Sequence, residues 1–158
     1  DGIRDIGVTG VQTCALPISA RGTSDNAATY AKYLWQITAG LPCGLAAPSV
    51  HTLYNGKVAF KDALVVGVSQ SGAGEDVNEV ISQAKAAGAL TAAITNTSTS
   101  ALAGIADHVL FCEAGLEKAV AATKTYTTTL AIFAQLGAML GGDKALLDSV
   151  YQIGRAHV

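Results

Sequence analysis

The chain has 158 residues, of which 50% are hydrophobic and 14% are charged, so it can bury one sizeable core but is short for two domains. Its formal net charge of −2, without a run of Lys or Arg, excludes the broad positive field that gathers phosphate backbones, and we expect no nucleic-acid partner. The longest apolar stretches fall well short of the roughly 20 residues of a membrane span, so we expect no membrane partner and a cytoplasmic location.

Both ends of the chain resemble the in-frame translation of a common short-read sequencing adapter. Residues 1–5 (DGIRD) and 8–18 (VTGVQTCALPI) match the adapter codon by codon, and residues 153–158 (IGRAHV) match the reverse complement of its inner end. We therefore expect residues 1–19 and 153–158 to be artefacts, and residues 20–152 to be one domain cut from a longer gene and truncated at its first strand.

The three cysteines, Cys14, Cys43 and Cys112, form no CxxC pair and have no histidine at ligand spacing. Neither a metal site nor a disulfide framework is predicted, which fits a reducing compartment. We expect Cys43 and Cys112 to be small core residues because free cysteines are commonly buried.

The first element expected after the adapter-like segment is a helix over residues 25–39, which Gly40 and Pro42 terminate. We expect its Tyr30 and Trp35 in the core rather than in a stacking platform. Its apolar residues near one face are Ala27, Ala31, Leu34 and Ile37.

Residues 63–68 (ALVVGV) form a continuous apolar run, which predicts a central strand buried on both faces. An amphipathic helix follows, with Glu75 and Asp76 in its first turn and Gly88 as its C-terminal stop. Its apolar residues at helical spacing are Val77, Val80, Ile81 and Ala84.

Residues 89–95 and 108–112 predict two further strands, with a short helical crossover at 100–105 between them. Residues 120–140 predict a long helix, whose hydroxyl run at 123–129 satisfies the early backbone groups. This alternation of strands and helices indicates an α/β fold with a parallel sheet.

The turn at residues 69–74 (SQSGAG) joins the central strand to the amphipathic helix, at the sheet edge where ligands bind. Its two serine hydroxyls, its backbone N–H groups and the helix start could converge on one phosphate. The alternative is a polar turn that only caps the helix. Glu75 and Asp76 favour that alternative, because carboxylates in a first turn repel an anion.

A second segment of this kind, residues 21–24 (RGTS), precedes the first helix, and two such turns at neighbouring strand ends favour a shared phosphate site. The turn at residues 69–74 lacks the third glycine of GxGxxG, and no GxxxxGK[ST] occurs. No cofactor is therefore expected. His51 and His108 are isolated, and we expect a helix-surface and a strand-edge histidine rather than ligands or bases.

Three segments, ARGTSDNAA, VSQSGAGEDV and EAGLEKAVAATKTYTTTL, resemble the diagnostic segments of SIS (sugar isomerase) domains. The match is closest to the first of the two SIS domains in isomerizing aminotransferases and in related amino-sugar-phosphate deaminases. This resemblance implies a three-layer αβα sandwich with a parallel, Rossmann-like (flavodoxin-like) sheet. It also implies a hexose 6-phosphate or amino-sugar phosphate as ligand, and a second SIS domain or a homodimer partner.

The resemblance also implies which residues of this chain would bind the phosphate. Gly74 stands where the family usually has Thr or Ser, so one hydroxyl is lost while its backbone N–H remains; Ala122 likewise stands where the aminotransferases have Ser. Val120 and Lys124 match positions near the sugar. The phosphate residues that the resemblance implies are Thr23, Ser24, Ser69, Gln70, Ser71, Gly72 and Gly74.

The family's catalytic Glu, Lys and His belong to the second SIS domain and the C-terminal tail, so we expect no catalytic residue in this chain and no activity of the chain alone. Two alternatives stay open. One is the sugar-phosphate-sensing domain of a transcription regulator, and the other is a stand-alone phosphosugar isomerase. The sequence that precedes residue 20 in the uncut gene, or a second SIS repeat downstream, would decide between them.

Overall fold

The structure is a computed structural model that describes residues 15–118 and 122–155. Its centre is one five-stranded sheet in the order β2-β1-β3-β4-β5, in which every pair of neighbours is parallel. The predicted α/β class with a parallel sheet is confirmed. The strands are β1 (Leu16–Ala20), β2 (Cys43–Ala46), β3 (Leu64–Val68), β4 (Leu90–Thr95) and β5 (His108–Phe111).

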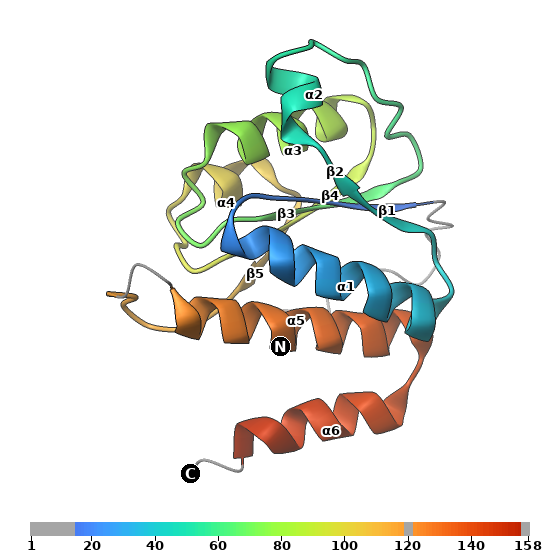
Figure 1. Ribbon diagram of the computed structural model, residues 1–158, viewed down its shortest axis with the longest axis vertical. Helices are drawn as coiled ribbons and strands as arrows, with labels where there is room; N and C mark the ends of the chain where they lie inside the picture. The colour runs from blue at the N-terminus through green and yellow to red at the C-terminus, as the bar shows by residue number, and fades with distance from the viewer. Residues whose placement is uncertain (1–14, 119–121, 156–158) are drawn as a thin grey trace.

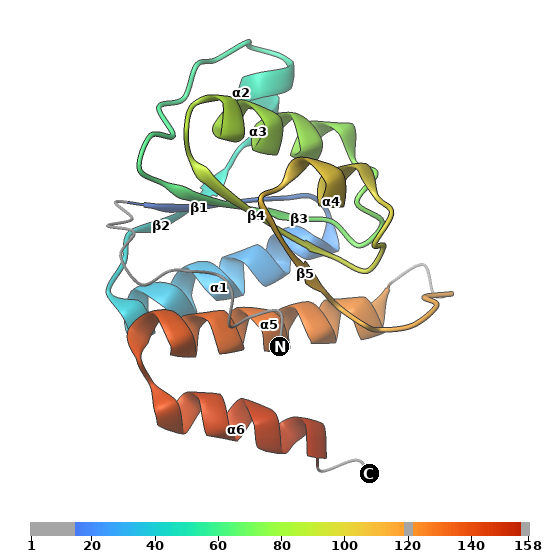
Figure 2. The same cartoon turned by 180° about the vertical axis from the view of Figure 1, so that it is seen from behind.

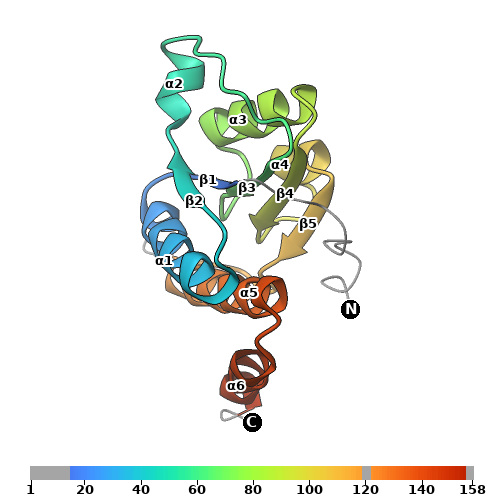
Figure 3. The same cartoon turned by 90° about the vertical axis from the view of Figure 1, so that its right-hand side faces the viewer.

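Helices cover both faces of the sheet, which gives the expected three layers (Figures 1 and 3). On one face lie α1 (Thr23–Ala39) and α5 (Thr123–Gly141), with α6 (Lys144–Arg155) packed on the outer side of α5. On the opposite face, the upper one in Figure 2, lie α2 (Pro48–Thr52), α3 (Glu75–Ala86) and α4 (Ala101–Ile105).

The central strand β3 is buried along its whole length, as its unbroken apolar run predicts. Its Val66 and Val68 belong to the core under α1 and α5, whereas Val65 faces the core under α3 and α4. Gly67 lies where a Cβ would come 2.7 Å from Ile81, so its lack of a side chain lets α3 pack closely on the sheet.

The helices α1 and α5 pack side by side around Trp35 (Figure 1). The Trp35 Nε1–H donates to the Phe133 carbonyl at 2.9 Å, and the two rings meet edge to face with centroids 5.3 Å apart. Gly137 and Gly141 permit this approach, because a Cβ on either would collide with Trp35 or with the Thr38 backbone.

The orientation of α1 differs from the expectation at two residues. Trp35 is buried as predicted, but Tyr30 is 40% exposed and Ile37 is 78% exposed, so their prediction as core-facing residues is wrong. The cause is that small residues decide which side of α1 approaches the sheet. Ala27, Ala28 and Ala31 are fully buried, which turns the larger side chains outward.

His51 corrects a second expectation, because it is 3% exposed rather than on a helix surface. Its ring stacks on Phe60 at a centroid distance of 5.6 Å, and its Nδ1 lies 2.7 Å from Gln83 Oε1. The short helix α2 packs against α3, and this contact covers the imidazole. His108 begins the edge strand β5 and is half-buried, as expected for a strand-edge residue.

Both described cysteines are free thiols. Cys112 is buried, and burial raises its pKa. Cys43 is only half-buried, yet burial raises its pKa to about 11, against a smaller lowering by Lys32. Cys14 lies outside the described residues. Within residues 15–118 and 122–155, no cluster of metal-ligating side chains occurs, and no helix is long and apolar enough to span a membrane.

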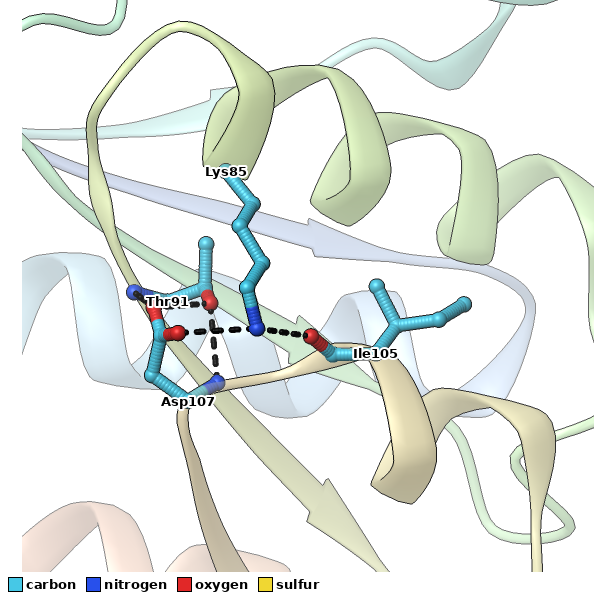
Figure 4. Close-up of polar contacts among 4 residues, drawn as sticks. All are labelled: Lys85, Thr91, Ile105 and Asp107. Atoms are coloured by element: carbon cyan, nitrogen blue, oxygen red, sulfur yellow. Dashed lines mark hydrogen bonds and ion pairs between the residues drawn. The ribbon is translucent and has the colours of Figure 1, made fainter.

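A polar cluster joins α3, β4 and β5 at the amino edge of the sheet (Figure 4). The Asp107 carboxylate accepts hydrogen bonds from the Thr91 amide at 3.0 Å and hydroxyl at 2.7 Å, and pairs with Lys85 Nζ at 2.9 Å. Lys85 also donates to the Ile105 carbonyl at 2.8 Å. Burial raises the pKa of Asp107, but the bonds from Lys85 and Thr91 outweigh it and hold that pKa below its ordinary value. We call these four residues the Asp107 cluster.

Candidate functional site

The two hydroxyl-rich turns emerge side by side at the carboxyl edge of the sheet. The chain passes from β1 to β2 on one side and then to β3 on the other, so the sheet changes direction between β1 and β3. Ala20 pairs with Val68, and residues 21–24 and 69–74 follow directly after these two residues. Ligands of such folds bind at this switch point, and the prediction that the two turns lie at neighbouring strand ends is confirmed.

The serine turn, as we call residues 69–74, is held in place by its backbone. The Ser69 amide donates to the Ile94 carbonyl at 3.1 Å, and the Gln70 carbonyl accepts from the Asn96 amide at 3.0 Å. Gly72 has a φ of 62°, and a Cβ there would run into the Ser100 side chain. Glycine at this position is therefore required by both conformation and space.

The two serine hydroxyls of the turn keep their protons available. Ser69 Oγ accepts from the Gly72 amide at 3.1 Å, and Ser71 Oγ accepts from the Ala73 amide at 3.3 Å. A hydroxyl that accepts one hydrogen bond still has an O–H to donate. Both groups can therefore donate to an anion held above the turn.

Neither serine caps the helix that follows. Gly74 is the N-cap of α3 and makes no side-chain capping bond, and Gly22 at the start of α1 makes none either. In the part of the chain that the structure describes, the Thr23 and Ser24 hydroxyls have no hydrogen-bond partner. Two helix starts thus face the same edge (left in Figure 1), and the one amide of the first turn of α3 that a side chain caps, that of Val77, is bonded to Asp76 rather than to a serine of the turn.

An ion pair connects the two turns. Arg21, directly after β1, donates from Nη1 to Asp76 Oδ2 at 2.7 Å, and Asp76 lies in the first turn of α3. Glu75 beside it is exposed and makes no polar contact within the described residues. Sequence reasoning identified both carboxylates but missed the pairing, because 55 positions separate Arg21 from Asp76.

Asn96 is a second residue that the sequence did not single out. Its side chain accepts from the Ala114 amide at 3.0 Å and donates to the Gly115 carbonyl at 2.8 Å, while its own amide holds the serine turn. Asn96 therefore ties the serine turn to the loop after β5. A polar residue directly after a buried strand was the available signal.

The ammonium group of Lys124 is bonded to the backbone of the β5–α5 loop. Lys124 Nζ donates to the Leu116 carbonyl at 2.8 Å and to the Ala114 carbonyl at 3.3 Å. The Glu117 carboxylate accepts from the Lys124 and Thr125 amides at 3.1 and 3.2 Å and so caps α5, a role that sequence reasoning missed. Val120 lies outside the described residues.

The hydroxyl run begins α5 as predicted, but its hydroxyls bond to helix carbonyls, while Glu117 satisfies the early amides of Lys124 and Thr125. The Thr127 and Thr129 hydroxyls donate to the carbonyls four residues earlier, at 2.9 and 2.8 Å. Ala122 precedes the helix with a φ of 46°. Its methyl group offers no hydroxyl to a ligand.

A cavity of about 300 Å³ opens beside the first turn, between Arg21 and Gly22 on one side and residues 45–49 on the other. It lies on the β2 side of the switch point and does not include the serine turn. A second cavity, of about 590 Å³, lies between β2, His51 and Phe60 and is lined mainly by apolar groups. Neither cavity is lined by a hydroxyl-bearing residue of the two turns.

Relatives in sequence are isomerizing aminotransferases. The chain is 40% identical over 126 residues to the glutamine–fructose-6-phosphate aminotransferase of Halobacterium salinarum, covering 80% of this chain and 21% of that protein. It is 39% identical over 140 residues to the enzyme of Xanthomonas campestris pv. campestris, covering 88% of this chain and 22% of that protein. The chain thus spans about a fifth of the length of these relatives.

Solved structures share the fold. A protein of Silicibacter pomeroyi DSS-3 assigned as a phosphosugar isomerase matches with a TM-score of 0.83 and 34% identity, over 89% of this chain and 43% of that one. The C-terminal domain of glucosamine-fructose-6-phosphate aminotransferase from Francisella tularensis matches with 0.74 and 27%, over 90% and 42%. The NanR protein of Vibrio vulnificus, complexed with ManNAc-6P, shares the fold alone, with 0.70 and 17% over 93% and 57%.

The family itself follows from a match over most of the chain. The model of the SIS domain matches residues 16–139, which include both turns, the whole sheet and most of α5. Its extent agrees with the relatives in sequence and with the solved structures. The chain belongs to the SIS domain family.

Proposed function

We propose that this chain is a sugar-phosphate-binding domain, which holds the phosphate of a hexose 6-phosphate or an amino-sugar phosphate between the serine turn and the start of α1. The observation that carries the proposal is the position of two helix starts, each with a glycine N-cap that makes no side-chain capping bond, beside serine hydroxyls that can still donate. N–H groups at helix starts favour an anion over a neutral ligand. The proposed phosphate residues are Thr23, Ser24, Ser69, Gln70, Ser71, Gly72 and Gly74.

We further propose that the domain belongs to a larger isomerase, aminotransferase or deaminase acting on hexose 6-phosphates. The identity to isomerizing aminotransferases supports this parentage. The chain covers 43% and 42% of two matching solved chains, which leaves room for a second domain of similar size. A second SIS domain or a second copy of this chain would complete the active site.

Isothermal titration calorimetry tests the binding. The whole chain is titrated with fructose 6-phosphate and glucosamine 6-phosphate, and with unphosphorylated fructose as the comparison. We expect the phosphorylated sugars to bind and fructose to bind far more weakly. Equal affinity for fructose and fructose 6-phosphate in a folded sample would contradict the proposal.

Serine substitutions then locate the phosphate. Ser69→Ala and Ser71→Ala each remove one charge-assisted hydrogen bond, so each should lower the affinity about tenfold or more, corresponding to about 1.5–3 kcal/mol. Ser149→Ala is the matched control, because it removes an exposed hydroxyl from α6. Indifference of the affinity to both turn substitutions would mean that the serine turn is not the site.

A turnover assay separates binding from catalysis. We place no catalytic residue in this chain, so the purified chain should bind sugar phosphates without isomerising, deaminating or aminating them. Turnover of fructose 6-phosphate or glucosamine 6-phosphate that is abolished by Ser69→Ala would show that the chain is itself an enzyme.

A further inference from the structure

One carboxylate, that of Asp76, lies beside residues of the proposed phosphate site. Asp76 Oδ1 accepts from the Val77 amide at 2.9 Å at the start of α3. A side chain on Gly74 would begin 3.4 Å from this oxygen and 3.9 Å from Ser69 Oγ. The negative charge of Asp76 is therefore close to a hydroxyl that would hold the phosphate, where it opposes the binding of an anion.

The opposite charge comes from the other turn. Arg21 reaches across the switch point and places Nη1 2.7 Å from Asp76 Oδ2. The Asp76 side chain is 29% exposed and that of Arg21 is 64% exposed. Together the two side chains carry no net charge, whereas Asp76 alone would carry a full negative charge.

The ion pair between Arg21 and Asp76 contributes too little to stability to be needed for holding the two turns together. Exposed ion pairs contribute little to the stability of a conformation. The serine turn is also already fixed by backbone bonds to Ile94, to Asn96 and, from the Leu102 amide to the Gly72 carbonyl at 3.1 Å, to α4. The pair therefore acts through its charge rather than as a clamp.

We propose that Arg21 is a positioning residue of the phosphate site, which neutralises Asp76 so that a phosphate dianion reaches the serine turn without repulsion. This inference rests on the proposed function. It also removes the objection that a carboxylate in the first turn of α3 excludes an anion. Arg21 acts through Asp76, and its guanidinium stays on the carboxylate when the sugar phosphate binds.

Calorimetry on the whole chain with fructose 6-phosphate and with inorganic phosphate tests this role. Arg21→Ala should lower both affinities roughly threefold to tenfold, since it leaves a like charge near the phosphate. Arg21→Ala/Asp76→Asn should return to within about twofold of the unaltered chain, and Arg21→Lys should retain its affinity because the charge is kept. Thermal melts of all variants should be nearly unchanged, since the pair is exposed.

Glu75→Gln on the Arg21→Ala background is the matched control. It removes a carboxylate from the same helix turn, but one that Arg21 does not contact. We expect it to restore less affinity than Asp76→Asn. Equal restoration would overturn the inference, since the net charge of the helix start and not this pair would then set the affinity.

Two further outcomes would overturn the inference. A direct phosphate contact by Arg21 predicts that the double variant and Arg21→Lys stay about tenfold weak or weaker. A clamp predicts that Asp76→Asn alone loses as much affinity as Arg21→Ala. The proposed function fails separately if the unaltered chain does not prefer fructose 6-phosphate to fructose. If the unaltered chain has this preference and Arg21→Ala does not change either affinity, only the role of Arg21 is contradicted.

Discussion

Two polar clusters lie at opposite edges of the same sheet, and they differ in what their hydrogen bonds leave open. In the Asp107 cluster the carboxylate, the Thr91 hydroxyl and the Lys85 ammonium bond to one another and to the backbone. In the serine turn, the hydroxyls of Ser69 and Ser71 only accept, and keep a proton to donate. Closed pairing indicates a structural role, whereas open donors beside helix starts indicate a ligand.

The largest expected effect lies at the amino edge. Asp107→Ala leaves the fully buried Thr91 hydroxyl and the Thr91 amide without their acceptor, so the free energy of unfolding should fall by about 2–3 kcal/mol. Urea denaturation measures this loss, and calorimetry should show an unchanged affinity for fructose 6-phosphate. Asp148→Ala, at an exposed carboxylate of α6, is the control and should change neither quantity. A loss of affinity in folded Asp107→Ala would mean that the two edges are coupled.

The Ser19 hydroxyl belongs to neither kind of polar cluster, because it is unpaired and also closed to solvent and ligand. Its hydroxyl is buried in β1 without a hydrogen-bond partner among the described residues. Ser19→Ala removes this unsatisfied group and should raise the free energy of unfolding by about 1–2 kcal/mol in urea denaturation. The same change at Ser149 on the surface should have little effect. A clear destabilisation by Ser19→Ala would show that the hydroxyl is satisfied in solution.

Gly74 allows the open cluster to be extended. Its φ of −66° and ψ of 109° suit other residues, and a Cβ there makes only ordinary contacts, the nearest 3.4 Å from Asp76 Oδ1. Gly74→Thr adds the hydroxyl that the SIS family usually carries and should raise the affinity for fructose 6-phosphate roughly threefold to tenfold by calorimetry. Gly74→Val has the same shape without the hydroxyl. Equal affinities of the Thr and Val variants would argue against a phosphate at this helix start.

The smallest expected effect is the pH dependence of the closed cluster. The pKa of Asp107 is lower in the folded chain than its ordinary value of 3.8, so ionised Asp107 stabilises the fold above that value. This contribution should be lost as the pH falls from 3.8 towards the lower folded pKa. Because the carboxylate is partly exposed, the loss should stay below about 1 kcal/mol. Urea denaturation at several pH values should show a shallower acid slope for Asp107→Asn, and an unchanged slope would contradict this assignment.

Elements with a strong period could be predicted from the sequence, and short or edge elements could not. The buried run of β3 and the helical spacing of α3 identified both elements. The edge strand β2 (CGLA) contains a glycine and no β-branched residue, and the helix α2 has five residues, so neither gives a clear pattern. The helix α6 was not predicted, although its hydrophobic and polar residues alternate with a helical period.

The site divides in the same way. Both hydroxyl-rich turns were predictable, because small polar residues directly follow apolar runs. The contacts between distant segments, such as Arg21 with Asp76 and Asn96 with Gly115, depend on the order of the strands, which local patterns do not contain. The first strand is a special case, since β1 occupies residues 16–20 and lies largely within the segment that we expect to be adapter-derived.

Gly72 has a consequence for the motion of the serine turn. Its carbonyl accepts from the Leu102 amide, and the Ser100 side chain, which caps α4, fills the space that a Cβ of Gly72 would occupy. The turn and α4 are thus one interlocked piece. We expect the amide hydrogens of the turn and of α4 to exchange with solvent in a single local opening. The turn and α4 should then form a rigid surface for the ligand and not a lid that closes over it.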